Sequence, residues 1–258
     1  VINEGDIAII KPNVAHAMVF TKDSIFLNLV RGEREHENYG ITHTIPYKLV
    51  NDEMRDRLLS TYKTSCRSCG NVYLDRCVSL GSSPLANNLI SSKDENVDTY
   101  PLEMNYCSKC KNCQLSVVVP PEEMFDEYLY VSSTSSKFVN HFEEAANDYI
   151  EEFDLNEKSL VVDVGSNDGI ALRTFKDNGI KVLGIDPAKN IAKIANEKGI
   201  RTYAGYFTKD VVQEMIEDHG RANLVTASNV FAHSDELYNM ASNAFDFLTE
   251  DGTFIVEV

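Results

Sequence analysis

Four of the six cysteines form two C-x2-C pairs, Cys66 with Cys69 and Cys107 with Cys110. Each pair presents two sulfurs from one tight turn, so the two pairs supply the four thiolates of a tetrahedral zinc site. A catalytic zinc keeps an open position, whereas four cysteines fill the coordination shell, so the spacing predicts a structural zinc ion. Cys113 could replace Cys107 in a pair with Cys110, but we prefer Cys107. The alternative, six unrelated buried thiols, is disfavoured by the doubled spacing.

A glycine-containing turn, Gly165-Ser-Asn-Asp-Gly169, follows the apolar run Leu160–Val164, and the next apolar run ends on Asp186. A strand, a glycine turn, a helix and a second strand with a terminal acid are the arrangement of a βαβ nucleotide site. A dinucleotide fingerprint has a middle glycine that lets the backbone approach a pyrophosphate, but here that position is Asn167. The turn is therefore poorly suited to a pyrophosphate.

S-adenosylmethionine carries no phosphate and is the better candidate for this pocket. Its methionyl ammonium and carboxylate need an acceptor and backbone donors, which Asp163 and the turn can supply. The two oxygens of Asp186 match the two hydroxyl donors of a ribose. A different α/β cofactor such as NAD is the alternative. The predicted cofactor-binding residues are Asp163, Gly165, Ser166, Asn167, Gly169, Asp186, Pro187 and Asn229.

Strands and helices alternate along the chain from Leu160 onward, and this alternation positions the turn. Five strands with right-handed crossovers make a doubly wound parallel sheet of order 3-2-1-4-5, with the ligand at the carboxyl ends of its first and fourth strands. A helix with an apolar stripe precedes the first strand. The expected strands are 160–164, 181–185, 201–204, 223–227 and 253–258, and the stripe is Phe138, Phe142, Ala145, Tyr149 and Phe153.

Three further side chains are candidates for the acceptor side of the site. Tyr128 and Tyr130 lie two apart in a β-prone stretch and would face the same side, although such residues more often serve packing. Ser228, Asn229 and His233 leave the end of the fourth predicted strand, and binding residues concentrate on loops at that edge of a sheet. We therefore favour a functional role for His233 over a capping or packing role.

The N-terminal stretch reads as short strands separated by Gly, Pro, Asn and Asp. Gly5, Pro12 and His16 have the spacing G-x6-P-x3-H, which resembles the second motif of the cupin barrels, where the His is a metal ligand. The first cupin motif, which supplies the other ligands, has no counterpart, and one His cannot hold a metal alone. A hairpin with a surface His is the equal alternative.

The segment between and after the cysteine pairs carries a second resemblance. It reads Ser79-Leu-Gly-Ser-Ser-Pro-Leu-Ala-Asn-Asn88 and, later, Gln114-Leu115. With its flanking cysteines it resembles the N-terminal zinc module of the sugar C-methyltransferases that act on nucleotide-linked deoxysugars. The match extends through 128–135 and the glycine turn to His233. The turn and Asp186 are similar to the class I methyltransferase pattern D-x-G-x-x-x-G with an acid ending the second strand.

This resemblance implies methyl transfer to a ring carbon beside a 4-keto group, by way of an enolate that a general base generates. In the family the base is a His of a Glu-His pair that lies after the fifth strand, and this chain ends before it. The resemblance leaves Tyr128 and Tyr130 on the sugar side and His233 at the rim as catalytic candidates. We therefore expect the chain to bind S-adenosylmethionine weakly or moderately and not to methylate.

Composition sets the outer limits of these hypotheses. A formal net charge of −16 argues against nucleic acid, because binding phosphates needs a Lys and Arg footprint. The sequence has no run of 18 apolar residues and no signal-like start, so we expect no membrane association and a cytoplasmic location. Both ends look truncated, and an apolar last strand at the sheet edge predicts self-association.

Together these observations predict an α/β protein: an incomplete, doubly wound Rossmann-like methyltransferase sheet, a small zinc-binding module and an N-terminal β-rich partial cupin. Two rival functions stay open. One is a methyltransferase with another sugar or small-molecule acceptor, and the other is a non-enzymatic zinc-ribbon adaptor. The predicted domains are 1–50 (cupin-like), 51–64 (linker helix), 65–120 (zinc module) and 121–258 (methyltransferase).

Overall fold

The computed structural model describes residues 61–86, 88–92, 94–95, 97–126 and 128–258. The chain divides into two units, Val1–Thr64 and Ser65–Val258, and the second unit holds the helices and strands that follow. The predicted cupin-like segment 1–50, with His16, and residues 51–60 of the predicted linker helix lie outside the described residues. No helix within the described part of the chain is both long and apolar enough to cross a membrane.

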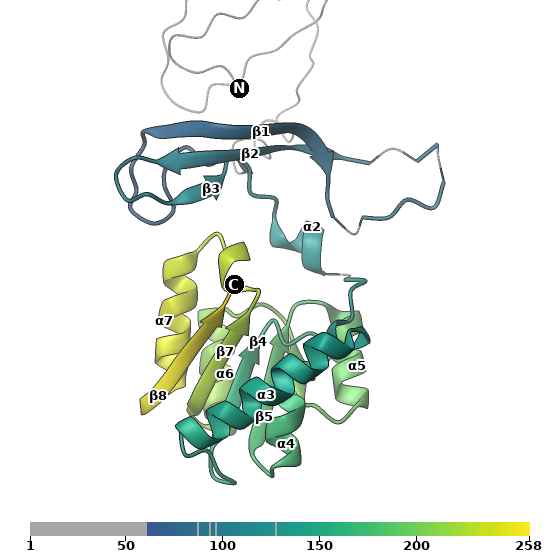
Figure 1. Ribbon diagram of the computed structural model, residues 1–258, viewed down its shortest axis with the longest axis vertical. Coiled ribbons are helices and arrows are strands. Elements are labelled where there is room, and N and C mark those ends of the chain that lie inside the picture. The colour runs from purple at the N-terminus through teal and green to yellow at the C-terminus, as the bar shows by residue number, and fades with distance from the viewer. Residues whose placement is uncertain (1–60, 87, 93, 96, 127) are drawn as a thin grey trace, which may run out of the picture. The chain divides into compact units, whose positions relative to one another are not determined.

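The zinc-module segment forms a three-stranded antiparallel sheet of order β1-β2-β3 (Figure 1). Its strands are β1 (Leu74–Pro84), β2 (Thr99–Cys107) and β3 (Cys113–Leu115). Nearly every residue of β1 is exposed, and Val117 is the only buried aliphatic side chain among the described residues of 65–120. So small an apolar core contributes little folding free energy, which is the situation in which a metal site stabilises a module.

The C-terminal part of the chain forms a five-stranded parallel sheet of order β6-β5-β4-β7-β8. This order is 3-2-1-4-5 in chain sequence and confirms the predicted topology. All five residues of β4 are buried, as expected for the central strand of a sheet covered on both faces. The strands are β4 (Leu160–Val164), β5 (Lys181–Asp186), β6 (Thr202–Ala204), β7 (Ala222–Ser228) and β8 (Leu248–Glu257).

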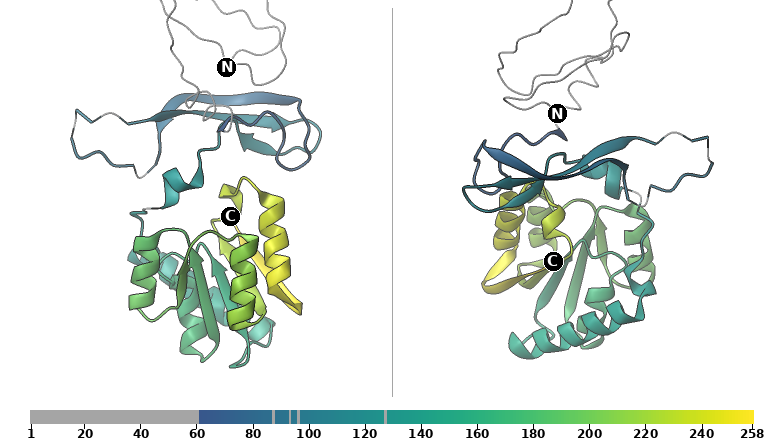
Figure 2. Two further views of the ribbon diagram at one scale, coloured as in Figure 1. Left: turned by 180° about the vertical axis from the view of Figure 1, so that it is seen from behind. Right: turned by 45° about the horizontal axis from the view of Figure 1, so that its top comes forward.

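Helices cover both faces of this sheet (Figures 1 and 2). One apolar cluster joins α6 (Lys209–His219) and α7 (Leu237–Phe247) to Val162 and Leu183. The other joins α3 (Ser136–Glu152), α4 (Arg173–Asp177) and α5 (Lys189–Glu197) to Val161 and Leu224. Because Val161 and Val162 are adjacent in β4, their side chains point to opposite faces and each enters one cluster.

The structure corrects several predicted boundaries. The expected helix up to Asn178 is a short 3₁₀ helix, η3 (Ile170–Leu172), followed by α4. Strand β8 begins at Leu248 and not at Thr253, and its pairing with β7 shifts register between Ala222 and Leu224. Strand β8 lies at an edge of the sheet, and the predicted self-association through it stays a prediction.

The apolar stripe of α3 also differs from the expectation at its first position. Phe138 is 38% exposed, whereas Ala146 is 2% exposed and packs with Tyr149 and Phe153 in the cluster beneath the helix. The small Ala146 side chain lets the middle of α3 approach the sheet. Phe138 lies outside that cluster, and its ring packs against Phe142 in the next turn, with a ring-centroid distance of 5.9 Å.

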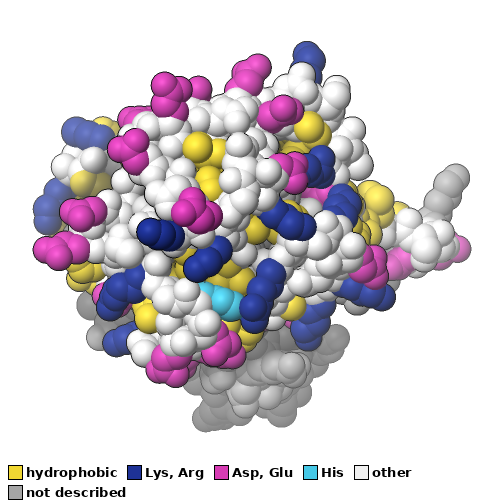
Figure 3. Space-filling model, turned by 90° about the horizontal axis from the view of Figure 1, so that it is seen from below, with side chains coloured by type: hydrophobic (Ala, Val, Ile, Leu, Met, Phe, Trp, Pro, Cys, Tyr) yellow, Lys and Arg dark blue, Asp and Glu magenta, His cyan; other side chains and the backbone are white. Residues whose placement is uncertain are grey.

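Charged side chains of both signs are mixed on the face seen from below in Figure 3. Lys and Arg side chains lie among Asp and Glu side chains there, although the formal net charge of the chain is −16. On this face the negative charge is therefore not gathered into one patch.

Candidate functional site

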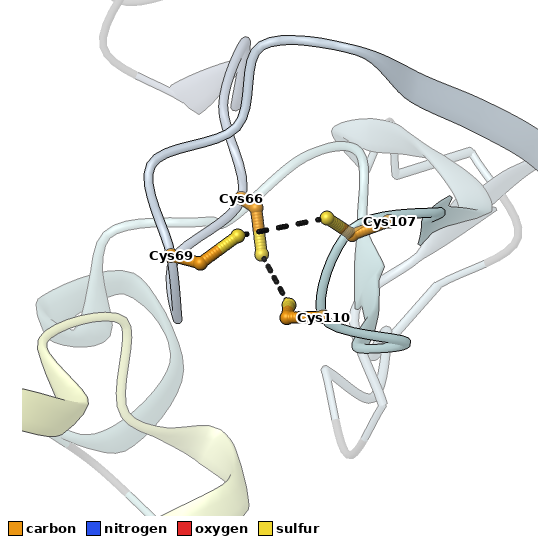
Figure 4. A group of neighbouring side chains, drawn as sticks. All are labelled: Cys66, Cys69, Cys107 and Cys110. Atoms are coloured by element: carbon orange, nitrogen blue, oxygen red, sulfur yellow. Dashed lines mark hydrogen bonds between the residues drawn. The ribbon is translucent and has the colours of Figure 1, made fainter.

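The four cysteines of the two C-x2-C pairs come together in space (Figure 4). Their sulfur atoms all lie within 4.8 Å of one another. Cys66 Sγ is 3.4 Å from Cys110 Sγ, and Cys69 Sγ is 3.7 Å from Cys107 Sγ. A tetrahedral site with zinc–sulfur bonds of about 2.3 Å has sulfur–sulfur edges of about 3.8 Å, so these four residues fit a zinc ion.

The two cysteine turns have the same backbone structure. Gly70 N donates to Cys66 O at 2.8 Å, and Lys111 N donates to Cys107 O at 2.8 Å. The residue after each second cysteine is left-handed, with φ of 70° at Gly70 and 68° at Lys111. Only one of the two turns therefore contains the glycine that such a φ favours. The feature of the sequence that identifies both turns is the C-x2-C spacing.

The remaining cysteines lie outside the cluster. Cys113 is exposed on β3, and Cys77 on β1 directs its thiol to Met104 O at 3.3 Å. The structure therefore assembles the predicted set with Cys107 and Cys110, not one with Cys113. Within that set the backbone amide of Cys110 lowers the pKa of the Cys107 thiol to about 6, against the effect of burial. A lowered pKa favours the thiolate, the form that binds a metal.

The glycine turn after β4 is a tightly packed structure. Gly165, Asn167 and Gly169 have φ of 68°, 49° and 81°, which are left-handed values that glycine and asparagine tolerate best. A Cβ added at Gly165 would lie 2.4 Å from Val230 Cγ2. The turn is thus held between β4 and the loop after β7, at the carboxyl ends of the two strands that the predicted topology marks for ligand binding.

The two predicted cofactor acids lie on neighbouring strands at this edge. Asp163 in β4 is 4% exposed and accepts a hydrogen bond of 2.7 Å from Thr226 Oγ1. Burial, opposed by that bond and reinforced by the charges of Asp186 and Glu257, raises the pKa of Asp163 to about 7. The carboxyl of Asp163 is thus buried between β4 and β7.

Asp186 is the last residue of β5, and its carboxylate accepts hydrogen bonds from two backbone amides, one in the glycine turn and one just after β5. Its Oδ2 accepts from Asn167 N at 2.8 Å, and its Oδ1 accepts from Ala188 N at 2.9 Å. Burial raises its pKa, although both backbone bonds lower it. Because each carboxylate oxygen has a second lone pair, both oxygens can still accept a hydroxyl hydrogen. Pro187 is half-buried between Asp186 and Ala188.

Carboxylates predominate where β4, β5 and β8 end. Among the described residues Asp163 and Asp186 have no Lys or Arg partner, and Glu257 pairs with His141 at 2.9 Å. Glu257 also lines, with Thr226 and α3, a shallow depression that is open to solvent. Such an acidic edge repels a pyrophosphate and attracts a cation, so the donor set fits a ligand with a sulfonium, an ammonium and ribose hydroxyls.

The segment that carries the predicted tyrosines is not a strand. Tyr128 is half-buried and Tyr130 is 42% exposed, and their backbone pairs with side chains and not with a neighbouring strand. Asn190 Nδ2 donates to Tyr128 O at 2.7 Å, and Asn167 Nδ2 donates to Tyr130 O at 3.1 Å. The expectation of two tyrosines on one face of a strand is therefore wrong, because side-chain amides satisfy the backbone here.

The other predicted residues lie around the turn and its rim. Asn229 is exposed with φ of 57°, and its amide donates to Glu257 O at 2.8 Å. His233 is exposed at the end of the 3₁₀ helix η4 (Phe231–His233). Ser166 is buried, and its hydroxyl has no partner among the described residues. These three positions keep their predicted roles as hypotheses.

Sequence reasoning missed the residues that hold the turn from outside. Thr226 supports Asp163, and Lys198 forms an ion pair with Asp168, whose side chain is fully buried. Asn190 lies on α5 and donates a hydrogen bond to the backbone of Tyr128, which is 62 residues away in sequence. The one charged residue of the turn, Asp168, was the available signal, because a carboxylate that becomes buried requires a partner.

Comparisons with known proteins agree with this arrangement. Residues 66–125 match a family described as "Putative zinc binding domain", and residues 138–258 match one described as "Methyltransferase domain". The C-methyltransferase NovU of Streptomyces niveus is 35% identical over 195 residues, which are 75% of this chain and 46% of that protein. The chain thus spans less than half the length of this relative.

Among solved structures, a SAM-dependent methyltransferase from Archaeoglobus fulgidus is 17% identical, with a TM-score of 0.39 over 46% of this chain and 52% of that one. The CcbJ methyltransferase from Streptomyces caelestis is 20% identical, with a TM-score of 0.37 over 45% of this chain and 47% of that one.

Proposed function

Because the chain belongs to the methyltransferases in which a zinc-binding domain precedes a methyltransferase domain, we propose that it serves C-methylation of a nucleotide-linked 4-keto-deoxysugar. The methyl donor in this proposal is S-adenosylmethionine. The observation that carries it is the acidic edge around the turn: Asp163 and Asp186 at the ends of adjacent strands, with Asn167 where a dinucleotide site has glycine. This edge suits a cationic nucleoside and not a pyrophosphate.

Each residue of the turn has a definite task in this proposal. Asp186 accepts the ribose hydroxyls with the lone pairs that its two backbone bonds leave free. Asp163, whose carboxyl is unfavourable to ionise in the free protein, becomes the negative partner of the methionyl ammonium once that cation lies beside it. S-adenosylmethionine, when bound, supplies an electrophilic methyl group on its sulfonium. The four cysteines would hold zinc as a structural ion, since no ligand position is left open.

The acceptor side must make a ring carbon nucleophilic. A base removes the proton beside the keto group, and a hydrogen-bond donor stabilises the enolate oxygen that results. We assign Tyr128 and Tyr130 to the sugar side and His233 to the rim, where their hydroxyl and imidazole groups can donate to sugar oxygens. The resemblance to NovU, whose name describes it as a C-methyltransferase, supports a carbon acceptor.

Calorimetry with S-adenosylhomocysteine, the stable product of methyl transfer, tests the cofactor site. Asp186→Asn keeps the shape of the side chain but replaces one acceptor oxygen with a donor, so we expect affinity to fall about tenfold or more. Asp177→Asn, an exposed acid on α4, is the matched control and should bind like the parent. No binding by the parent chain, or equal binding by both variants, would contradict the cofactor assignment.

The acceptor is tested separately with nucleotide-linked sugars that differ in the position of the keto group. The proposal expects the S-adenosylhomocysteine-loaded chain to bind the 4-keto sugar more tightly than its 4-hydroxy or 3-keto analogues. Equal binding of all three would point to another acceptor. Zinc binding without any S-adenosylhomocysteine binding would instead support the adaptor alternative.

A further inference from the structure

The tyrosine segment, residues 128–133, is held on the cofactor turn by polar side chains. Its backbone forms hydrogen bonds with three side chains: Asn190 on α5, and Asn167 and Asp168 in the turn. These partners lie 35 to 62 residues away in sequence. Its first part, 128–131, has no strand or helix structure, and its last residues begin the short 3₁₀ helix η2 (Ser132–Thr134), so the segment takes its position from these side-chain contacts.

Asn167 makes the central contacts of this arrangement. Its Nδ2 donates to Tyr130 O at 3.1 Å, and its Oδ1 accepts from Ser132 N at 2.9 Å. Its own backbone amide donates to Asp186 Oδ2 at 2.8 Å. One residue therefore connects the acid at the end of β5 with the segment that carries both tyrosines. Both polar atoms of the amide are used, and no other side chain of this size has a donor and an acceptor in one planar group.

Two flanking contacts limit how the segment can move around Asn167. At one side, Asn190 Oδ1 accepts from Tyr128 N at 3.3 Å while its Nδ2 donates to Tyr128 O at 2.7 Å. At the other side, Asp168 Oδ1 accepts from Ser133 N at 3.3 Å, and Lys198 Nζ donates to Ser133 Oγ at 3.2 Å. The segment is thus fixed at both ends, and Asn167 holds its middle.

We infer that Asn167 is a positioning residue that couples the occupied cofactor turn to the placement of Tyr128 and Tyr130. This inference rests on the proposed function, in which the tyrosines face the sugar. It also explains why the middle position of the turn is not glycine. Asparagine tolerates the left-handed φ of 49° and adds the bridging amide, whereas glycine would provide the φ alone.

The substitution Asn167→Gly tests this role cleanly. Glycine adopts the same φ without strain and keeps the backbone amide that Asp186 accepts, so only the bridge is removed. The chain contains no tryptophan, and Leu129, between the two tyrosines, is 63% exposed. Leu129→Trp therefore places a single fluorescent reporter in the segment. Asp154→Gly is the matched control, because Asp154 is also left-handed, with φ of 50°, and exposed at the end of α3.

In the reporter background we expect Asn167→Gly to lower tryptophan anisotropy and to increase acrylamide quenching, while Asp154→Gly changes neither. With S-adenosylhomocysteine at concentrations that saturate each variant, anisotropy should rise in the reporter chain and in Asp154→Gly. We expect this rise to be lost in Asn167→Gly. Asn167→Asp, which keeps the acceptor for Ser132 N but loses the donor to Tyr130 O, should restore part of the signal.

Thermal unfolding of each variant separates a local change from loss of folding. Unchanged anisotropy and quenching in a folded Asn167→Gly chain would overturn the inference, as would an undiminished response to saturating S-adenosylhomocysteine. If S-adenosylhomocysteine fails to bind the parent, the proposed function fails. The comparison without ligand would still decide whether Asn167 holds the segment.

Discussion

Thr226 Oγ1 donates a 2.7 Å hydrogen bond to Asp163 Oδ1 and so joins the neighbouring strands β7 and β4. This bond favours the ionised form of Asp163. Burial outweighs it and, with the charges of Asp186 and Glu257, raises the pKa of Asp163 to about 7. The acid that we assign to the cofactor ammonium is therefore unfavourable to ionise in the free protein, and a cation beside it would relieve that cost.

This raised pKa predicts a pH dependence of stability. The folded state keeps a proton on Asp163 up to about pH 7, whereas the unfolded chain releases it near the ordinary value of 3.8. The free energy of unfolding should therefore fall as pH rises from 4 to 7, by at most about 4 kcal/mol. Asp163→Asn keeps an acceptor for Thr226 and removes the titration, so its excess stability over the parent should grow across this range.

Urea unfolding at several pH values measures this difference. The exposed Asp177→Asn provides the control, and its curve should run parallel to that of the parent. Parallel curves for Asp163→Asn and the parent would show that Asp163 titrates normally. A cofactor role adds a second expectation: Asp163→Asn should bind S-adenosylhomocysteine more weakly while unfolding at higher urea at pH 8.

Gly165 should be more sensitive to substitution than Gly179, although both are left-handed, with φ of 68° and 79°. The Cβ of an alanine at position Gly179 would have no atom within 4 Å, so Gly179→Ala costs only the backbone strain, about 1–2 kcal/mol. Alanine at Gly165 would also place its Cβ 2.4 Å from Val230 Cγ2. Gly165→Ala should therefore lose about 1–3 kcal/mol more than Gly179→Ala in urea unfolding.

The double variant Gly165→Ala/Val230→Ala separates the two costs. If the collision with Val230 causes the extra loss of unfolding free energy in Gly165→Ala, the double variant should regain that extra loss. The cost of Val230→Ala alone is measured separately and subtracted. No recovery would mean that strain in the turn, and not contact with Val230, makes Gly165 necessary.

Replacing Lys198 should lower the free energy of unfolding far more than replacing Lys193, although both residues lie on or beside α5. Lys198 pairs with Asp168, whose side chain is fully buried, whereas Lys193 forms an exposed pair with Glu197. Lys198→Met leaves a buried carboxylate without its partner and should cost about 3 kcal/mol. Lys193→Met should stay within about 0.5 kcal/mol of the parent.

Adding Asp168→Asn to Lys198→Met removes the unpaired charge and should return part of the lost stability. A double-mutant cycle measures this coupling. Strictly additive effects would contradict the view that the two side chains stabilise the fold as a pair.

The cysteine cluster predicts one bound zinc ion per chain and a module that depends on it. Cys107→Ser should lose the zinc and make residues 66–125 sensitive to proteolysis, because the module has almost no apolar core of its own. Cys113→Ser, outside the cluster, should retain both zinc and resistance. Metal analysis and limited proteolysis measure the two properties, and equal zinc content in both variants would refute the assignment of ligands.

Local sequence patterns were sufficient to predict the strand order of the sheet and the ligands of the cysteine cluster. Apolar runs alternating with amphipathic segments predicted the strand order, because a strand buried on both faces must be apolar and crossovers have a fixed hand. The cysteine spacing likewise predicted the four-sulfur cluster, since each tight turn specifies two ligands without help from distant residues. Boundaries were less accurate, as at Leu248, because register shifts depend on the partner strand.

The sequence by itself therefore determined the sheet, the glycine turn and the residues able to bind zinc, all features encoded within a few neighbouring residues. The tertiary structure alone decided that Tyr128 and Tyr130 are not in a strand, that Asn167 serves two segments at once, and that Lys198 partners Asp168. The physical reason is that these contacts are hydrogen bonds and ion pairs between residues 30 to 62 positions apart. No periodicity records such contacts, because they exist only once the packed elements bring the two segments together.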